Sequence, residues 1–452
     1  MVAGCWAKLN RSIDSASFLS YLPQNLSVVS LSFETTRDKL RDVCATYRFQ
    51  SSALSARMPE TIEKRRPTPS RAVRFRLDIE GAHLIEVDGG RRGGGYPSGN
   101  LQLAPLYSQV HLRKDILVKK ISLLLVLAAA IGAAAPPTYK VIGKIKIGGG
   151  TRWDYAYIDS ANHRLYVTHG NQTEVIDTTT DKLVGTILDT KGVHGIAIAN
   201  DLGKGYTSDG TDNDVTVFDI KTLKVLSKVK TGQNPDAIIY DPVSKRVLTF
   251  NGKSADATIF DAKTGNIVTA SLPVGGKPEF AQVDGKGNVF VNIEDKNEIV
   301  VIDARNSVVS RRYSIAPCDG PSGLAIDPKN RLYSVCGNKM MIVSDAATGK
   351  VLGSPATGSG TDGVAFDDGY AFSANGTDGT ITMVGETSPG KFEPVATIPT
   401  MKSARTIIAD QKAHKLYLPA AEFGPAPEAK DGKKAGRPQA IPDSFQIVVV
   451  GR

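Results

Sequence analysis

The chain is poor in the residues that build metal and haem sites. It has four cysteines, six histidines and six methionines among 452 residues. No four Cys or Cys/His residues have the spacing of a structural zinc site, and no Cys-x-x-Cys-His haem-attachment sequence occurs. P-loop, dinucleotide-binding and nucleophile-elbow patterns are absent as well. The sequence therefore gives no support to the nucleotide-binding and serine-hydrolase classes, and it names no cofactor.

Helical periodicity is also missing from residue 139 onward, where two markers repeat instead. An acidic or amide residue after an apolar one recurs every 40 to 43 positions, at Asp159, Asn200, Asp241, Asp284, Asp327, Asp367 and Asp410. A second marker recurs every 42 positions, at Asp177, Asp219, Asp261, Asp303 and Asp345, and then drifts to Glu386. These carboxylates are interpreted as acceptors for turn amides. Seven copies of such a unit predict a seven-bladed β-propeller.

The first copy divides into four short segments separated by turns. Strands are expected at residues 154–159, 164–168, 174–177 and 183–188, because apolar and β-branched residues alternate there. Each copy is therefore expected to form a four-stranded antiparallel meander.

One tetrapeptide makes the repeat more specific. Tyr166-Val167-Thr168-His169 resembles the signature of the YVTN-repeat propellers, with His in place of the usual Asn. Apolar-Asp-Pro sequences at Asp241-Pro242 and Asp327-Pro328 are also typical of that family. The chain is similar to its YncE-like secreted branch over residues 139–452. The resemblance implies the fold but no single function, since propellers carry many unrelated activities.

The last copy lacks a fourth strand. Its strands are expected near residues 406–409, 415–418 and 445–450, after which only two residues follow. Residues 139–147 alternate cleanly ahead of the first copy, so they are expected to supply the missing strand and pair the two ends of the propeller. Such closure hides two sheet edges.

The residues before the repeats divide into two parts. Lys119-Lys120, an apolar run and Ala133-Ala134-Ala135 give residues 118–135 the pattern of a secretory signal peptide. A transmembrane anchor is the rival interpretation, although the run is shorter than the roughly 20 residues that span a bilayer. Residues 1–117 are interpreted as a non-native extension of the gene start or as a disordered arm. Residues 136–452 are the propeller, expected in the periplasm or outside the cell, as a monomer without an anchor after processing.

The positive charge is concentrated in the first part of the chain. Residues 1–135 hold 19 Lys and Arg against 11 Asp and Glu, whereas residues 136–452 hold 36 against 35. The near-neutral propeller has no basic run interleaved with aromatics, so nucleic acid is not expected as a partner.

Two cysteines, Cys318 and Cys336, lie in the propeller region. The first precedes an innermost strand and the second ends the neighbouring strand, so both are expected at the same rim. In a secreted protein this placement favours a disulfide, and a metal-binding or reactive pair is the alternative.

One face of a propeller gathers the loops that enter the innermost strands and the loops that join second to third strands. The first set is Arg152, Trp153, Asp154, His194, Asp236, Glu279, Ser322, Asp362 and Arg405. The second set is His169, Asn171, Asp209, Asn251, Glu294, Asn338, Asn375 and Glu422. The first set and His169 are predicted to line a polar mouth of the central channel.

Three functions are weighed for this mouth. The first is a binding site for a small ligand or for a periplasmic or outer-membrane protein. The second is a divalent-metal site of His194, Asp236, Glu279 and Asp362, which would suit a metal-dependent hydrolase like the lactonase propellers. The third is a redox-partner role. We expect a binding module rather than an enzyme.

The seventh copy has a long insertion between its second and third strands. It spans residues 421–444, is rich in Pro and Gly, and carries Lys430, Lys433, Lys434 and Arg437. It is interpreted as a neutral surface loop or, alternatively, as a lid or docking arm at the channel mouth.

Overall fold

The computed structural model describes residues 31–34, 42–47, 75–78, 84–86, 135–150, 152–425 and 438–452, the first four ranges as strand backbone only. The chain divides into two compact units, Met1–Ala129 and Ala130–Arg452. The predicted signal peptide up to residue 134 and residues 426–437 of the long insertion lie outside the described residues, as does most of the predicted extension at residues 1–117. In the first unit, four strands pair antiparallel in the order β1 (Leu31–Glu34), β2 (Asp42–Tyr47), β3 (Phe75–Asp78) and β4 (Leu84–Glu86).

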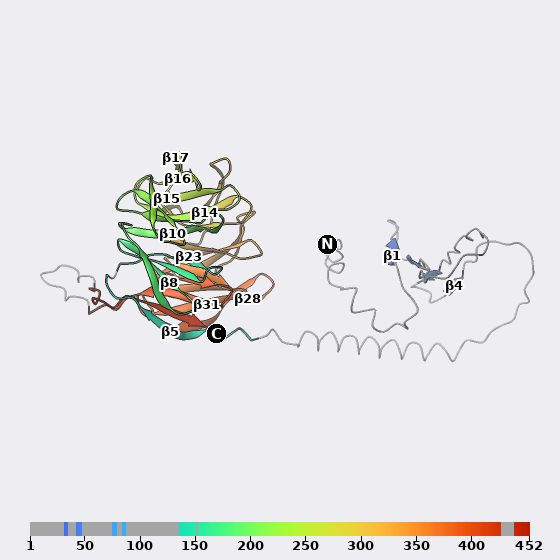
Figure 1. Cartoon of the computed structure of the whole chain (residues 1–452). Helices are drawn as coiled ribbons and strands as arrows, with labels where there is room; N and C mark the ends of the chain where they lie inside the picture. The colour runs from blue at the N-terminus through green and yellow to red at the C-terminus, as the bar shows by residue number, and fades with distance from the viewer. Residues whose placement is uncertain are drawn as a thin grey trace, which may run out of the picture. The chain divides into compact units, whose positions relative to one another are not determined.

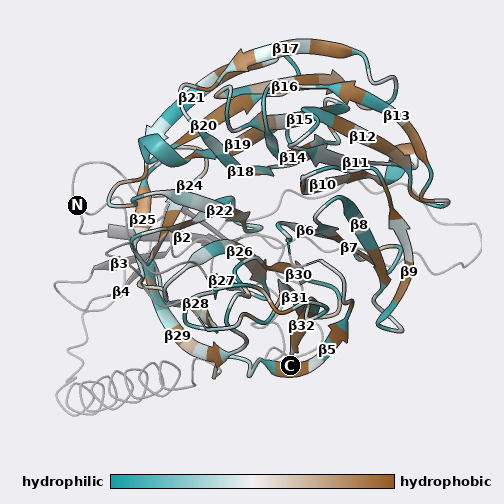
Figure 2. Ribbon diagram, turned by 90° about the vertical axis from the view of Figure 1, so that its left-hand side faces the viewer, coloured by the Kyte–Doolittle hydropathy of each residue, from teal (hydrophilic) through white to brown (hydrophobic). Residues whose placement is uncertain are grey.

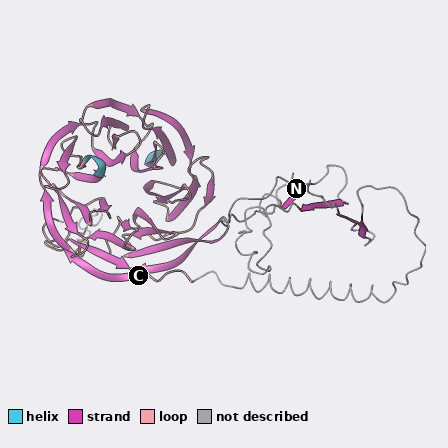
Figure 3. Ribbon diagram, turned by 45° about the vertical axis from the view of Figure 1, so that its right-hand side comes forward, coloured by secondary structure: helices cyan, strands magenta, loops and turns pink. Residues whose placement is uncertain are grey.

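The second unit is a seven-bladed β-propeller, as the repeats predict (Figure 3). Blades 1 to 3 are β6 (Ala156–Asp159), β7 (Arg164–His169), β8 (Gln172–Asp177) and β9 (Lys182–Ile187); β10 (Val193–Ala199), β11 (Lys204–Asp209), β12 (Asp214–Asp219) and β13 (Val225–Lys230); and β14 (Pro235–Asp241), β15 (Arg246–Asn251), β16 (Asp256–Asp261) and β17 (Ile267–Pro273). Blades 4 to 6 are β18 (Pro278–Val283), β19 (Asn288–Ile293), β20 (Glu298–Asp303) and β21 (Val308–Ser314); β22 (Pro321–Ile326), β23 (Arg331–Cys336), β24 (Met340–Asp345) and β25 (Val351–Gly353); and β26 (Thr361–Asp367), β27 (Tyr370–Asn375), β28 (Thr380–Ser388) and β29 (Lys391–Pro399). Short 3-10 turns connect β10 to β11, at η2 (Asn200–Leu202), and β19 to β20, at η3 (Glu294–Lys296).

Blade 7 joins the two ends of the propeller. Its strands are β30 (Ile408–Asp410), β31 (Lys415–Ala420), β32 (Gln446–Gly451) and β5 (Lys140–Lys146), in that order. The backbone of β5 pairs antiparallel with β32, so the start and the end of the propeller lie side by side (Figure 1). The predicted closure is confirmed.

The core lies between the blades. The first strand of each blade stands nearest the centre and the fourth runs along the perimeter (Figure 2). Second and third strands are buried almost throughout, whereas outer strands such as β13 and β17 are mostly exposed. Leu248 and Phe250 of blade 3 pack with Val289 and Val291 of blade 4 in one apolar cluster. Because each such cluster takes residues from neighbouring blades, the blades stabilise one another rather than folding around separate cores.

The repeated carboxylates form turns on the rims. Asp177 Oδ1 accepts hydrogen bonds from the amides of Thr179 and Thr180 at 2.9 and 3.0 Å. The second marker drifts at Glu386 because β28 and β29 are nine residues each and continue their hairpin past the usual turn. Glu386 then lies inside β28 and still accepts a hydrogen bond from the amide of Gly390, at 2.9 Å.

The innermost strands approach one another closely. A Cβ atom at Gly323 would lie 2.6 Å from the carbonyl oxygen of Asp362 on the next blade, so only glycine fits there. Among the residues that the structure describes, no helix is long and apolar enough to cross a membrane.

Candidate functional site

Seven side chains, one from each blade, occupy equivalent places where the innermost strands begin. We call them the mouth ring: Asp154, His194, Asp236, Glu279, Ser322, Asp362 and Arg405. In blades 2 to 6 each one is the second residue of its strand, and strand pairing skips it through a β-bulge. A bulge leaves a residue out of the ladder and redirects its side chain. The same irregularity therefore recurs at five of the predicted site residues.

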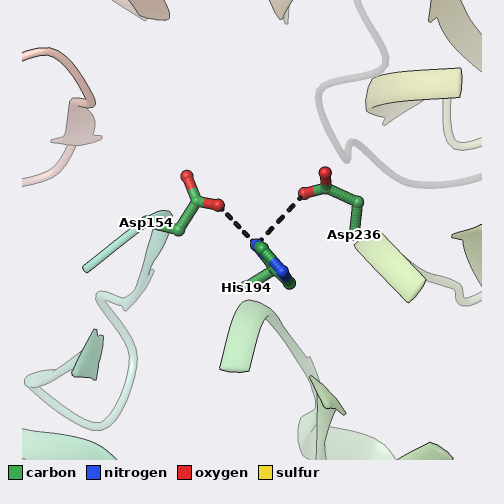
Figure 4. Close-up of side chains that lie close together, drawn as sticks. All are labelled: Asp154, His194 and Asp236. Carbon is green, nitrogen blue, oxygen red and sulfur yellow. Dashed lines mark hydrogen bonds and ion pairs between the residues drawn. The ribbon is translucent and has the colours of Figure 1, made fainter. Parts of the chain in front are cut away.

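Five members of the ring form a continuous chain of polar contacts across five blades. Arg405 Nε donates to Asp362 Oδ2 at 2.8 Å, and Arg405 Nη2 lies 3.6 Å from Asp154 Oδ1. His194 Nδ1 lies 2.7 Å from Asp154 Oδ2 and 3.7 Å from Asp236 Oδ1 (Figure 4). The repeat thus converts residues about 40 positions apart into direct neighbours.

The other two members differ in their surroundings. Glu279 is paired with Lys277, whose Nζ lies 2.6 Å from Glu279 Oε1 and also contacts Glu294. Ser322 Oγ is buried and makes no hydrogen bond with any described residue. The sequence reasoning missed Lys277, although its place two residues before Glu279 could have drawn attention to it.

The ring holds more carboxylates than cations. Burial, reinforced by the charge of Asp154, raises the pKa values of Asp236 and Asp362. Burial and the neighbouring Asp236 likewise raise the pKa of Glu279, against the effect of Lys277. Burial opposes the charge on His194, but the hydrogen bond to Asp154 and the surrounding carboxylates raise its pKa overall. Burial is therefore the main cause of the raised carboxyl pKa values, and the excess of negative charge adds to it while raising the pKa of His194.

His169 lies at the same face but is fully engaged. Its Nδ1 lies 2.9 Å from Glu174 Oε1 and its Nε2 donates to the carbonyl oxygen of Gly150 at 2.6 Å. Its ring stacks on Phe445 with centroids 4.3 Å apart. Since both nitrogens face acceptors, the surroundings favour the doubly protonated, charged imidazole. Its pKa is raised accordingly, because these hydrogen bonds outweigh the opposing effect of burial.

A cavity of about 870 Å³ opens beside the ring. Six of the ten predicted site residues line it: Arg152, Trp153, Asp154, His169, His194 and Arg405. The Arg405 guanidinium stacks on the Trp153 ring, 5.5 Å from its centroid, and the exposed Phe423 of the long insertion completes the wall. Asp236, Glu279, Ser322 and Asp362 are not among its lining residues.

An aromatic pair lies one residue further along the innermost strands. Tyr155 of blade 1 follows Asp154, Phe280 of blade 4 follows Glu279, and their ring centroids are 4.6 Å apart. Because blades 1 and 4 stand on opposite sides of the propeller, this contact crosses the axis. The mouth is polar, whereas two aromatic side chains meet across the axis directly behind it.

The predicted metal quartet is not gathered as a set. Among the described residues, the side chains whose ligand atoms lie within 4.8 Å of one another are Asp154, His194 and Asp236 (Figure 4). Two members of the quartet, His194 and Asp236, therefore meet with Asp154. The other two, Glu279 and Asp362, contact Lys277 and Arg405 instead.

Cys318 and Cys336 are joined by a disulfide, with Cα atoms 5.5 Å apart. The bond links the loop before β22 to the end of β23, and both sulfur-bearing side chains are buried.

Comparison with known proteins identifies the fold. No family model and no curated protein matches the sequence. Similar solved structures include U3-55K (TM-score 0.57, 7% identity, 70% of this chain and 99% of that one) and the WD40 repeats of RRP9 (TM-score 0.57, 7% identity, 71% and 99%). Hydrazine synthase of Kuenenia stuttgartiensis is also similar (TM-score 0.53, 14% identity, 64% and 96%). At these identities the likeness concerns the propeller fold alone.

Proposed function

We propose that this propeller is a periplasmic or otherwise secreted binding module that takes its ligand at the channel mouth. The observation that carries the proposal is the cavity of about 870 Å³, into which Arg405, His194 and Trp153 converge from three blades. Ligand sites are concave, lie in the range of about 300–1,000 Å³, and combine apolar walls with a few converging polar groups. The contact between Tyr155 and Phe280 across the axis, behind the mouth, also favours a pocket over a through-passage.

The lining favours a small polar ligand over an apolar one. Arg152, Arg405 and His194 offer donors, Asp154 offers acceptors, and Trp153 with Phe423 offers flat apolar surfaces. A protein partner that inserts one polar side chain into the same cavity is the other form of the proposal.

A thermal-shift panel of carboxylic acids, amines, sugars and nucleotides tests the proposal. We expect at least one class to raise the melting temperature of the wild type but not of His194→Gln or Arg405→Gln. His414→Gln is the matched control, because His414 contacts Asp367 at the opposite rim, with its Nδ1 3.1 Å from the carboxylate. Equal loss of the shift in the control variant, or no shift with any class, would contradict a small-ligand site.

Secretion is a separate part of the proposal. It is supported by the basic, apolar and small-residue pattern at residues 118–135. N-terminal sequencing of protein recovered from the periplasm or medium is expected to begin near Ala135 or Pro136. Exported soluble protein that retains Met1 would rule this processing out.

A metal-dependent hydrolase is the second candidate, favoured by the grouping of Asp154, His194 and Asp236. Metal sites of this kind lower the pKa of bound water and so generate a nucleophile. The candidate predicts hydrolysis of lactones only when a divalent metal is supplied. Hydrolysis that is unchanged by Asp236→Asn would eliminate it.

A further inference from the structure

We propose that Asp154, His194 and Asp236 form a site for one divalent transition-metal ion at the channel mouth. The inference rests on the proposed function only in placing the ligand site at this mouth; it does not require an organic ligand. The three residues come from three different blades, so the site exists only in the closed propeller.

The spacing of the ligand atoms fits a metal ion. Metals of this class bind imidazole nitrogen and carboxylate oxygen at about 2.0–2.2 Å, which separates neighbouring ligand atoms by roughly 3–4 Å. His194 Nδ1 lies 2.7 Å from Asp154 Oδ2 and 3.7 Å from Asp236 Oδ1, and all three atoms lie within 4.8 Å of one another. The 2.7 Å spacing is shorter than that range, so metal binding would require Asp154 to move slightly away from His194.

A proton on His194 Nδ1 cannot serve both neighbouring carboxylates. Nδ1 can donate one hydrogen bond, and Asp154 takes it at 2.7 Å. Asp236 Oδ1 points toward the same nitrogen at 3.7 Å, is sealed from solvent, and has no hydrogen-bond partner among the described residues. A buried carboxylate oxygen without a partner is costly. A metal ion would satisfy both carboxylates at once, with the Nδ1 proton released to solvent.

Neighbouring groups hold the three ligands in place. Arg405 Nη2 lies 3.6 Å from Asp154 Oδ1, the oxygen that does not face His194. A Cβ atom at residue 210 would lie 2.7 Å from the His194 ring, so Gly210 leaves the space that the ring occupies. Asp236 lies in the β-bulge at the start of β14, where the bulge directs its side chain.

The donor set decides the class of metal. One imidazole with two carboxylates suits Zn²⁺, Mn²⁺ or Fe²⁺, whereas Ca²⁺ and Mg²⁺ prefer oxygen ligands alone. We therefore expect Zn²⁺ and Mn²⁺ to bind and Ca²⁺ to compete poorly.

Titration calorimetry of tag-free, chelator-treated protein with ZnCl₂ or MnCl₂ alone measures the site. We expect one ion per chain, and at least tenfold weaker binding in each of Asp154→Asn, His194→Gln and Asp236→Asn. Glu279→Gln is the discriminating variant, because this ring carboxylate contacts Lys277 outside the trio, and His414→Gln at the opposite rim is the matched control. Co²⁺ absorption adds an independent readout, because a coordinating imidazole changes the visible spectrum of the ion. Circular dichroism melts show whether each variant is folded.

Three results of these measurements would distinguish the metal site from its alternatives. Wild-type protein that binds neither ion at millimolar concentration, or binds equally well in the three variants while they remain folded, would overturn the site. Loss of binding in Glu279→Gln with none in Asp154→Asn would instead point to the set expected from the sequence. If metal binds but no organic class shifts the melting temperature, the small-ligand form of the binding-module proposal fails and the metal site stands.

Discussion

Two rings of side chains lie on one face of this propeller, and they differ in how their polar atoms are paired. The mouth ring reaches across blades and carries polar atoms, at Asp236 and Ser322, that have no partner among the residues the structure describes. The strand-end ring consists of the last residues of the second strands: His169, Asp209, Asn251, Ile293, Cys336, Asn375 and Ala420. All seven of these are buried.

The two asparagines of the strand-end ring are satisfied within their own blades. Asn251 Nδ2 donates to Asp256 and Thr258 at 2.8 and 3.0 Å, and Asn375 Nδ2 donates to Thr380 and Thr382 at 3.1 and 2.9 Å. Polar residues at the ends of the second strands therefore stabilise the fold. The mouth-ring residues, which leave the strand pairing through a β-bulge, are the candidates for binding.

The largest expected effect on stability is that of replacing His169, which is compared with replacing His194. His169→Gln leaves Glu174 without its buried cation, so we expect a loss of about 3 kcal/mol in unfolding free energy. His194→Gln is expected to cost about 1 kcal/mol or less, because the His194 side chain is 29% exposed against 5% for His169. Urea denaturation of both variants measures the difference, and equal losses would erase the distinction between the rings.

The same pair has a defined pH dependence. The folded-state pKa of His169 is raised from 6.5, so its contribution is complete below pH 6.5 and declines as the pH rises through the folded value. The pKa of Glu174 is lowered from 4.5, because the hydrogen bonds that it accepts from His169, Gln172 and Thr186 outweigh burial. Its contribution to stability is therefore complete above pH 4.5 and is lost as the pH falls through the folded-state pKa. The cost of His169→Gln is therefore expected to peak between pH 4.5 and 6.5.

The disulfide replaces a polar strand-end residue in blade 5. The cysteines are 18 positions apart, and closing a loop of that size stabilises by about 3 kcal/mol. The Cys318→Ala/Cys336→Ala double variant is expected to lose about that much on denaturant unfolding. Mass mapping without reductant is expected to find the two residues linked, and two alkylatable thiols in the folded protein would refute the bond.

Replacing Asp209 is expected to increase stability rather than to decrease it. Burial raises its pKa to about 7, although Thr216, Thr207 and Lys228 oppose this. A raised carboxyl pKa means that stability falls as the pH rises from 3.8 to about 7. Asp209→Asn, which copies Asn251 of blade 3, is expected to stabilise the protein by about 2 kcal/mol at pH 8 and by nothing at pH 3, as measured by thermal melts. A variant that is less stable at pH 8 would show that the pair with Lys228, at 3.4 Å, dominates.

The smallest effect compares two serines of blade 5. Ser334 Oγ donates to Asn292 Oδ1 at 2.9 Å, whereas Ser322 Oγ of the mouth ring has no partner among the described residues. Ser334→Ala is expected to cost about 1 kcal/mol and Ser322→Ala to cost nothing or to gain about 0.5 kcal/mol. Differential scanning calorimetry would resolve the pair, and a clear loss in Ser322→Ala would give that hydroxyl a structural role.

Much of this molecule follows from its one-dimensional pattern. The period of about 42 residues predicted the number of blades. The strands expected at residues 415–418 and 445–450 agree with β31 and β32 to within two residues. The missing fourth strand of the last copy predicted the pairing of β5. Symmetry also placed the mouth ring, because equivalent positions of a repeat meet around one axis. Local alternation and turn chemistry suffice for such features, since each blade repeats the same short-range solution.

The pairing of charges was decided only by the tertiary structure. The sequence grouped Glu279 and Asp362 with His194, but Lys277 and Arg405 hold those two carboxylates, and Asp154 takes their place. Nor did the pattern distinguish His169, with both nitrogens bonded and its ring on Phe445, from His194 at the open mouth. The sequence by itself determined which residues reach the axis, because the repeat specifies position. Which of them touch depends on β-bulges, neighbouring blades and side-chain reach, and these exist only once the ring of blades is closed.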